Sequence, residues 1–222
     1  MTTILVTGAT GTVASEVLAA LEGKAGVKVL AGVRSAAKGG ALRRANIEPV
    51  DFDYEKPETV SAALQGVDKV FLLTPFVLES VAYGKALIDA AKAAGVKQIV
   101  KLSAFGSEIE PGIQLGRWHR EVEKHLEASG VAYTILRPNN FMENFLNYYP
   151  PAADGNIYLP WGEAACSFIA GEDIGRVAAA ALTEPGHENK AYTLTGPSAF
   201  SIAEAAKVIS EVSGRAVRYV DV

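Results

Sequence analysis

The sequence predicts an α/β fold, a doubly wound parallel sheet, for most of the 222-residue chain. Short apolar runs of strand type alternate with segments in which apolar residues recur at helical spacing, as expected for a parallel sheet covered by helices on both faces. A glycine-rich turn joins the first strand to the first helix. An irregular stretch that begins at Pro138 interrupts the alternation and predicts a small C-terminal α/β region beside the sheet.

The first strand and turn carry the most specific signal. A buried apolar run, residues 4–6, stops at Thr7-Gly8, and from Gly11 onward apolar residues recur as in a helix. Gly8 allows a sharp turn, and Gly11 lets the backbone approach a pyrophosphate at the helix N-terminus, where free N–H groups and the helix dipole attract an anion. Paired glycines also occur in ordinary turns, but the strand–turn–helix context favours a dinucleotide-binding unit. The expected contacts are Gly8, Thr10, Gly11, Thr12 and Val13.

The later elements continue the alternation. We expect strands at 27–33, 47–52, 66–73, 97–103 and 130–136, and helices at 57–64, 78–94 and 114–129. Pro49 lies in the third strand and places it at an edge of the sheet. Helices are expected again at 172–182 and 202–213, with a strand at 192–195 between them. The predicted organisation is a Rossmann-like core at 1–137 and a substrate-side region at 138–222 that is interleaved with the core.

Composition argues against several classes of partner. A net charge of −4 and a pI near 5.5 offer no attraction to nucleic acid or an anionic membrane. The longest apolar patch, residues 70–78, is too short to span a bilayer, and no targeting segment precedes the first strand. The single cysteine, Cys166, fits a reducing cytoplasm, and the three histidines show no metal-ligand spacing. We expect a cytoplasmic protein with a small-molecule partner and no metal, and a homodimer stays open as an alternative to a monomer.

The end of the second strand favours one nicotinamide cofactor over the other. Arg34 closes this strand, and Lys38 follows one helical turn later. No acidic residue stands where a carboxylate would bind a ribose 2′-hydroxyl, whereas a guanidinium offers several donors to a 2′-phosphate. The sequence therefore predicts NADPH, with Arg34 and Lys38 at its 2′-phosphate. The alternative is an ordinary solvated arginine.

Three further strand ends are expected along the cofactor, because ligands of doubly wound sheets bind outside the carboxyl ends of the strands. Asp53 follows the third strand and is placed to accept from the adenine amino group, although a turn cap before Pro57 is an equal alternative. Thr74 and Pro75 follow the fourth strand, where simple turn chemistry is the alternative. Ser103 ends the fifth strand.

Several of these segments together resemble a known superfamily. The Thr7–Gly11 turn, the Ser103 strand end, the Glu123-x-x-Leu126 helix and the segment 134–139 resemble the short-chain dehydrogenases. The segments 173–178, 182–187 and 192–197 look like the NmrA-like branch of that superfamily. The resemblance covers nearly the whole chain and implies a Rossmann-like fold that binds NAD(P). Members of the branch run further than 222 residues, so we expect a further C-terminal piece.

The chain departs from the superfamily at its catalytic pair. Typical short-chain dehydrogenases carry Tyr-x-x-x-Lys on this helix, and the corresponding positions here are Leu115 and His119. Leucine transfers no proton, which disfavours alcohol and ketone chemistry and sugar-nucleotide epimerisation. Hydride transfer to a quinone or a conjugated cation survives this loss, because a hydroquinone phenolate, with a pKa of ~10, takes a proton from water or a weak donor.

Such chemistry needs a flat apolar pocket that stacks the acceptor. Six aromatic residues are candidates for it, although aromatics after a strand are more often core: Phe76, Phe141, Phe145, Tyr148, Tyr149 and Trp161. An amide-rich cluster follows Pro138 and adds Asn139 as a cofactor contact. The predicted acceptor contacts are Phe76, Asn140, Phe141 and Tyr148. His119 is the candidate catalytic residue, and a helix-surface histidine is the alternative.

The sequence thus supports an NADPH-dependent reductase of a small aromatic or quinone-like acceptor. The alternative from another class is a non-catalytic sensor of the NmrA type, in which cofactor occupancy biases a protein partner and no hydride moves. A proton donor or an aromatic pocket beside the nicotinamide distinguishes the two.

Overall fold

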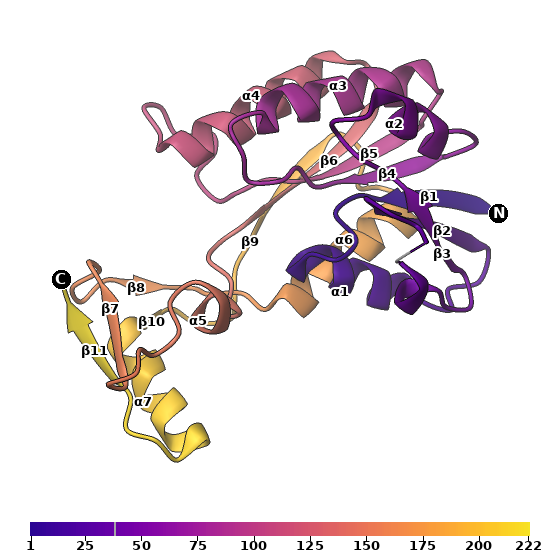
Figure 1. Cartoon of the computed structure of the whole chain (residues 1–222). Helices are drawn as coiled ribbons and strands as arrows, with labels where there is room; N and C mark the ends of the chain where they lie inside the picture. Colours follow the sequence, from indigo (N-terminus) through magenta and orange to yellow (C-terminus); the bar gives the residue numbers. More distant parts are fainter. Residues whose placement is uncertain (38) are drawn as a thin grey trace. The chain divides into compact units, whose positions relative to one another are not determined.

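The computed structural model describes residues 1–37 and 39–222, and the chain divides into two compact units (Figure 1). Unit 1 contains Met1–Pro138 and Glu172–Thr193. Unit 2 contains Asn139–Gly171 and Leu194–Val222. The chain beyond Pro138 therefore contributes to both units.

Unit 1 is built on a seven-stranded sheet of order β3-β2-β1-β4-β5-β6-β9. The strands are β1 (Thr2–Val6), β2 (Val27–Val33), β3 (Ile47–Asp51), β4 (Lys69–Leu72), β5 (Gln98–Leu102), β6 (Ala132–Pro138) and β9 (Lys190–Leu194). The order reverses direction at β1, as in a doubly wound sheet, and each neighbour from β3 to β6 runs parallel. The predicted fold class is confirmed, and β3 with its Pro49 lies at the sheet edge as expected.

Helices cover both faces of this sheet (Figure 1). They are α1 (Thr12–Leu21), α2 (Pro57–Ala63), α3 (Ser80–Ala93), α4 (Gln114–Ala128) and α6 (Gly171–Thr183), with a short 3-10 turn at Gly40–Leu42. Helices α2, α3 and α4 pack one buried apolar face against the strands, while α1 and α6 lie on the other side of the sheet. Gly175 of α6 is essential to that second layer, because a Cβ there would lie 2.6 Å from the backbone of Glu16 in α1.

Several predicted boundaries differ from the structure by one to three residues, and two of them have a clear local reason. The helix predicted from residue 78 begins at Ser80, because the Ser80 hydroxyl bonds to the loop before it: it donates to the carbonyl of Pro75 at 2.5 Å and accepts from the N–H of Val77 at 3.1 Å. The sixth strand continues to Pro138 instead of ending at residue 136, because the Pro138 carbonyl accepts from Phe105 at 2.9 Å.

Unit 2 holds the remaining elements, α5 (Asn144–Asn147), β7 (Asn156–Leu159), β8 (Ala165–Cys166), β10 (Phe200–Ser201), α7 (Ile202–Ser213) and β11 (Arg218–Asp221). They form two small sheets, antiparallel β10-β8 and parallel β11-β7, over a core centred on the buried ring of Phe168. Helix α7 begins with a capping box between Ser201 and Glu204. No helix in the described part of the chain is both long and apolar enough to cross a membrane.

Candidate functional site

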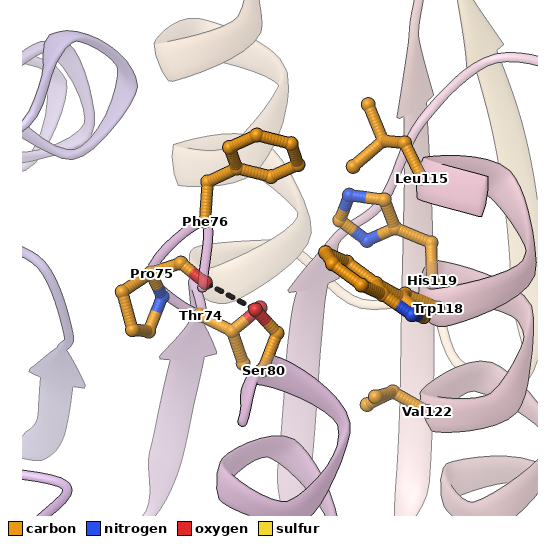
Figure 2. A pocket seen from close by; sticks show the side chains of 8 residues that line it. All are labelled: Thr74, Pro75, Phe76, Ser80, Leu115, Trp118, His119 and Val122. Carbon is orange, nitrogen blue, oxygen red and sulfur yellow. Dashed lines mark hydrogen bonds between the residues drawn. The ribbon is translucent and has the colours of Figure 1, made fainter. Parts of the chain in front are cut away.

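The candidate site of unit 1 lies where β1, β4 and β5 end and where α1 and α4 begin. It contains a cavity of about 60 Å³ lined by Thr74, Pro75, Phe76, Ser80, Leu115, Trp118, His119 and Val122 (Figure 2). Leu115 and His119, the residues at the catalytic-pair positions, both face this cavity, as the four-residue spacing predicts.

The glycine turn after β1 fits a pyrophosphate. Gly8 has a φ of +65°, a conformation that side chains disfavour, and a Cβ there would lie 3.0 Å from Leu73 Cδ2. Helix α1 begins after Gly11 without a side-chain cap, so its first N–H groups are free to bind an anion. Thr10 and Thr12 are exposed at this end, whereas the buried Val13 offers only its backbone. These features match a dinucleotide phosphate site.

The predicted contacts at the ends of β2 and β3 differ from each other in whether their side chains already have partners. Arg34 is exposed, and within residues 1–37 and 39–222 it makes no ion pair, so its guanidinium is available for a phosphate. Lys38 lies outside the described residues. Asp53 accepts from the N–H of Glu55 at 3.1 Å and lies 3.7 Å from Lys56 Nζ. The carboxylate of Asp53 thus caps its own turn, which was the alternative weighed for it; its contact with adenine stays a prediction.

The loop after β4 forms one wall of the cavity. Thr74 and Pro75 are half-buried there, and the carbonyl of Pro75 is held by Ser80 (Figure 2). The side chain of Phe76 is 76% exposed, with its ring centroid 5.9 Å from that of Trp118 on α4. Trp118 of α4 forms an aromatic pair with Phe76, and both rings line the cavity.

Helix α4 forms the opposite wall. It packs closely on α3, because Gly84 of α3 leaves room for Val122: a Cβ on Gly84 would lie 2.8 Å from Val122 Cγ1. His119 is half-buried on this wall, and burial together with the nearby Lys101 cation lowers its pKa from 6.5 to about 3. The imidazole is therefore neutral near pH 7 and acts as a hydrogen-bond donor and acceptor. The surface-histidine interpretation is wrong, because the ring faces the cavity.

Lys101 is the residue that the sequence interpretation missed. It lies in the middle of β5 and is fully buried, with Nζ 3.0 Å from His119 Nδ1 and 2.9 Å from the Leu102 carbonyl, to which it donates. Burial lowers the pKa of Lys101 from 10.5 to about 7. A lysine within the otherwise apolar run 99–102 was the available signal.

Glu123, one helical turn beyond His119, is the centre of a buried ion cluster. It accepts from Ser103 Oγ at 2.5 Å, from Ser107 Oγ at 2.8 Å, from Arg120 at 2.9 Å and from Arg137 at 2.8 Å and 3.1 Å. Burial alone would raise its pKa, but these hydrogen bonds, led by those from Arg137 and Ser103, outweigh burial and lower it to about 2. Glu123 therefore fixes Ser103 at the end of β5 and stays ionised, and the contact of Ser103 with a cofactor remains a prediction.

The other predicted contacts belong to unit 2. Asn139 accepts from the N–H of Asn140 at 2.9 Å through its side-chain oxygen, and the Cys166 thiol donates to the same oxygen at 3.4 Å. Phe141 bridges to Ile169, and the side chain of Tyr148 is 80% exposed. Three of the pocket candidates instead belong to the core cluster of unit 2 that contains Phe168, namely Phe145, Tyr149 and Trp161. For these three, the core alternative is correct.

The similarity to known proteins extends over the whole chain. A model of the NmrA-like family matches residues 1–222. The chain is 46% identical to an NAD(P)H azoreductase of Xenophilus azovorans over 98% of this chain and 76% of that protein. It is 34% identical to quinone oxidoreductase 2 of Escherichia coli over 97% of this chain and 76% of that protein.

Solved structures of reductases are also similar to this chain along its whole length. An NADPH-dependent quinone oxidoreductase from Escherichia coli, crystallised with NADPH, superposes with a TM-score of 0.88 at 33% identity, over 99% of this chain and 78% of that one. Triphenylmethane reductase from Citrobacter sp. superposes with a TM-score of 0.88 at 28% identity, over 100% of this chain and 79% of that one.

Proposed function

Because the chain belongs to the NmrA-like family, we propose that it is an NADPH-dependent oxidoreductase that reduces a small aromatic or quinone-like acceptor. The observation that carries this proposal is the cavity between Phe76 and α4, where a neutral His119 stands among apolar and aromatic side chains. Relatives that reduce azo compounds and quinones and a neighbour that holds NADPH support it.

Different residues of unit 1 bind the cofactor, stack the acceptor and donate the proton in the proposed reaction. The Gly8–Gly11 turn and the free N-terminus of α1 bind the pyrophosphate, and when bound, NADPH supplies the hydride. Phe76 and Trp118 offer flat apolar surface on which an aromatic acceptor stacks. The anion left on the reduced acceptor needs one proton, and His119 is the neutral donor on the cavity wall. Leu115, where the superfamily has tyrosine, keeps this wall apolar.

Arg34 selects NADPH over NADH. Replacing Arg34 with alanine removes the guanidinium at the end of β2, and we expect the affinity for NADPH to fall about tenfold or more while the affinity for NADH is unchanged. Fluorescence titration with each nucleotide measures both constants. Arg43→Ala is the matched control, because Arg43 is also an exposed arginine but pairs with Glu48 at 4.0 Å. An unchanged NADPH to NADH affinity ratio in Arg34→Ala would show that this arginine is merely solvated.

The function is tested by anaerobic mixing of the protein with NADPH and a panel of benzoquinones and azo dyes, followed by the absorbance of the reduced nicotinamide. We expect oxidation well above the uncatalysed rate for at least one acceptor. NADPH binding without any oxidation would instead favour the sensor alternative.

The cellular setting is a further proposal. The single cysteine fits a reducing compartment and so supports a cytoplasmic location. The assignments of Asn139, Asn140, Phe141 and Tyr148 to a substrate-side region at 138–222 stay predictions, to be tested by their substitution in the same assay.

A further inference from the structure

The contact between Lys101 and His119 places a buried cation beside an imidazole, which the proposed reaction does not by itself require. Lys101 is fully buried, yet its two polar partners are the Leu102 carbonyl and an imidazole nitrogen, and neither is a carboxylate. Burying a cation without a paired anion is costly, and apolar side chains of similar volume usually serve the fold at least as well. A structural role alone therefore does not explain a lysine at this position.

The neighbouring charges do not neutralise Lys101 directly. Glu123 on α4 is the anion that faces it, but Ser103, Ser107 and the two arginines already occupy both carboxylate oxygens. Arg137 on β6 adds a repelling positive charge. The Lys101 ammonium thus directs its N–H groups to the Leu102 carbonyl and to His119 Nδ1.

The geometry determines which nitrogen of His119 carries the proton. While Lys101 is protonated its ammonium group donates only, so Nδ1 accepts, and the proton of the neutral ring then lies on Nε2. Figure 2 shows a ring nitrogen of His119 directed to the side on which Phe76 and Leu115 line the cavity. With Nδ1 bound to Lys101, this nitrogen is Nε2.

We propose that Lys101 is a positioning residue that holds His119 as its Nε2–H tautomer and resupplies the proton that His119 gives to the reduced acceptor. In this step the Nε2–H bond breaks and the proton joins the anionic oxygen or nitrogen of the acceptor. Nδ1 takes a proton from the Lys101 ammonium, which becomes a neutral amine. Water in the cavity then protonates Nε2, and Nδ1 returns its proton to the Lys101 amine, which restores the starting state. The inference rests on the proposed function for the transfer step, whereas the tautomer is a property of the protein alone.

The first test reads the tautomer without any activity. The chain has three histidines, so long-range ¹H–¹⁵N spectra of protein with ¹⁵N-labelled histidine can be assigned with His119→Phe. Near pH 6, we expect His119 to be neutral with its proton on Nε2. In Lys101→Met we expect a shift toward a mixture of tautomers, and in Lys124→Met, which removes an exposed lysine of α4, no change. A proton on Nδ1 in the wild type overturns the proposal even if Lys101→Met does not fold.

The second test separates positioning from folding. If Lys101 served only to stabilise the fold, Lys101→Met would lower Tm. For a positioning residue we expect the Tm of this variant to be unchanged or raised. We expect kcat with a quinone to fall at least about tenfold, with little change in the KM for NADPH. We also expect the wild-type decline of kcat above pH 7, where Lys101 loses its proton, to disappear in the variant. An unchanged tautomer and an unchanged pH profile in Lys101→Met would refute the inference, whereas an inactive wild type with the Nε2–H tautomer would refute only the reductase function.

Discussion

We expect the replacement of His119 with phenylalanine to lower kcat for quinone reduction by about 100-fold, near the lower end of what general acids contribute, because water can still protonate a hydroquinone anion slowly. We expect the Kd for NADPH to stay nearly unchanged, since the role proposed for His119 is proton donation to the acceptor and not cofactor binding. Stopped-flow kinetics under anaerobic conditions measure kcat, and fluorescence titration measures Kd.

The matched control is His125→Phe. His125 lies on the same helix but faces away, where it pairs with Asp89 at 2.7 Å on the surface. We expect wild-type turnover for this variant. If His119→Phe also turns over at the wild-type rate, the proton comes from another source and His119 has no catalytic role.

Replacing Glu123 with glutamine lowers the free energy of unfolding by about 3–5 kcal/mol, because it leaves the buried arginine contacts without their counter-charge. Urea denaturation measures the loss. Glu127→Gln on the same helix is the control, since Glu127 pairs with Arg120 at a partly exposed position and its loss costs under about 1 kcal/mol. Equal losses in both variants would contradict the view that the cluster depends on Glu123.

The effect of Glu123 also depends on pH. Its folded pKa of about 2 lies below the ordinary 4.5, so its stabilising contribution is complete above pH 4.5 and is lost as the pH falls toward 2. The difference in unfolding free energy between the wild type and Glu123→Gln is therefore expected to narrow between pH 5 and pH 3. A constant difference over this range would mean that another group sets the acid sensitivity.

The sheet and the phosphate turn were predictable because their signals are local. An apolar run, two glycines and a helical stripe follow one another within residues 4–21, and the structure needs little more to form β1, the turn and α1. The edge position of β3 follows from Pro49 alone. The end of β6 depends on a hydrogen bond to a residue far along the chain, and the start of α3 on a hydrogen bond to the preceding loop. No local sequence pattern contains either bond.

The cavity was less predictable because it depends on which elements face each other. The four-residue spacing of Trp118 and Val122 places both on one face of α4, but it does not show that Trp118 meets Phe76 beside a cavity. Likewise, Lys101 and His119 lie 18 residues apart, and only the packing of α4 on β5 brings them together. Aromatic residues after Pro138 carry no local sign that separates core rings such as Phe168 from exposed ones such as Tyr148.

The pairing of Trp118 with Phe76 equips the chain with its own optical probe. Of the two tryptophans, Trp118 borders the cavity of unit 1, while Trp161 packs against Phe168 in unit 2. In a Trp161→Phe background, the indole emission reports from the cavity alone. Quenching by a stacked quinone can then be followed in real time, without a label and independently of turnover.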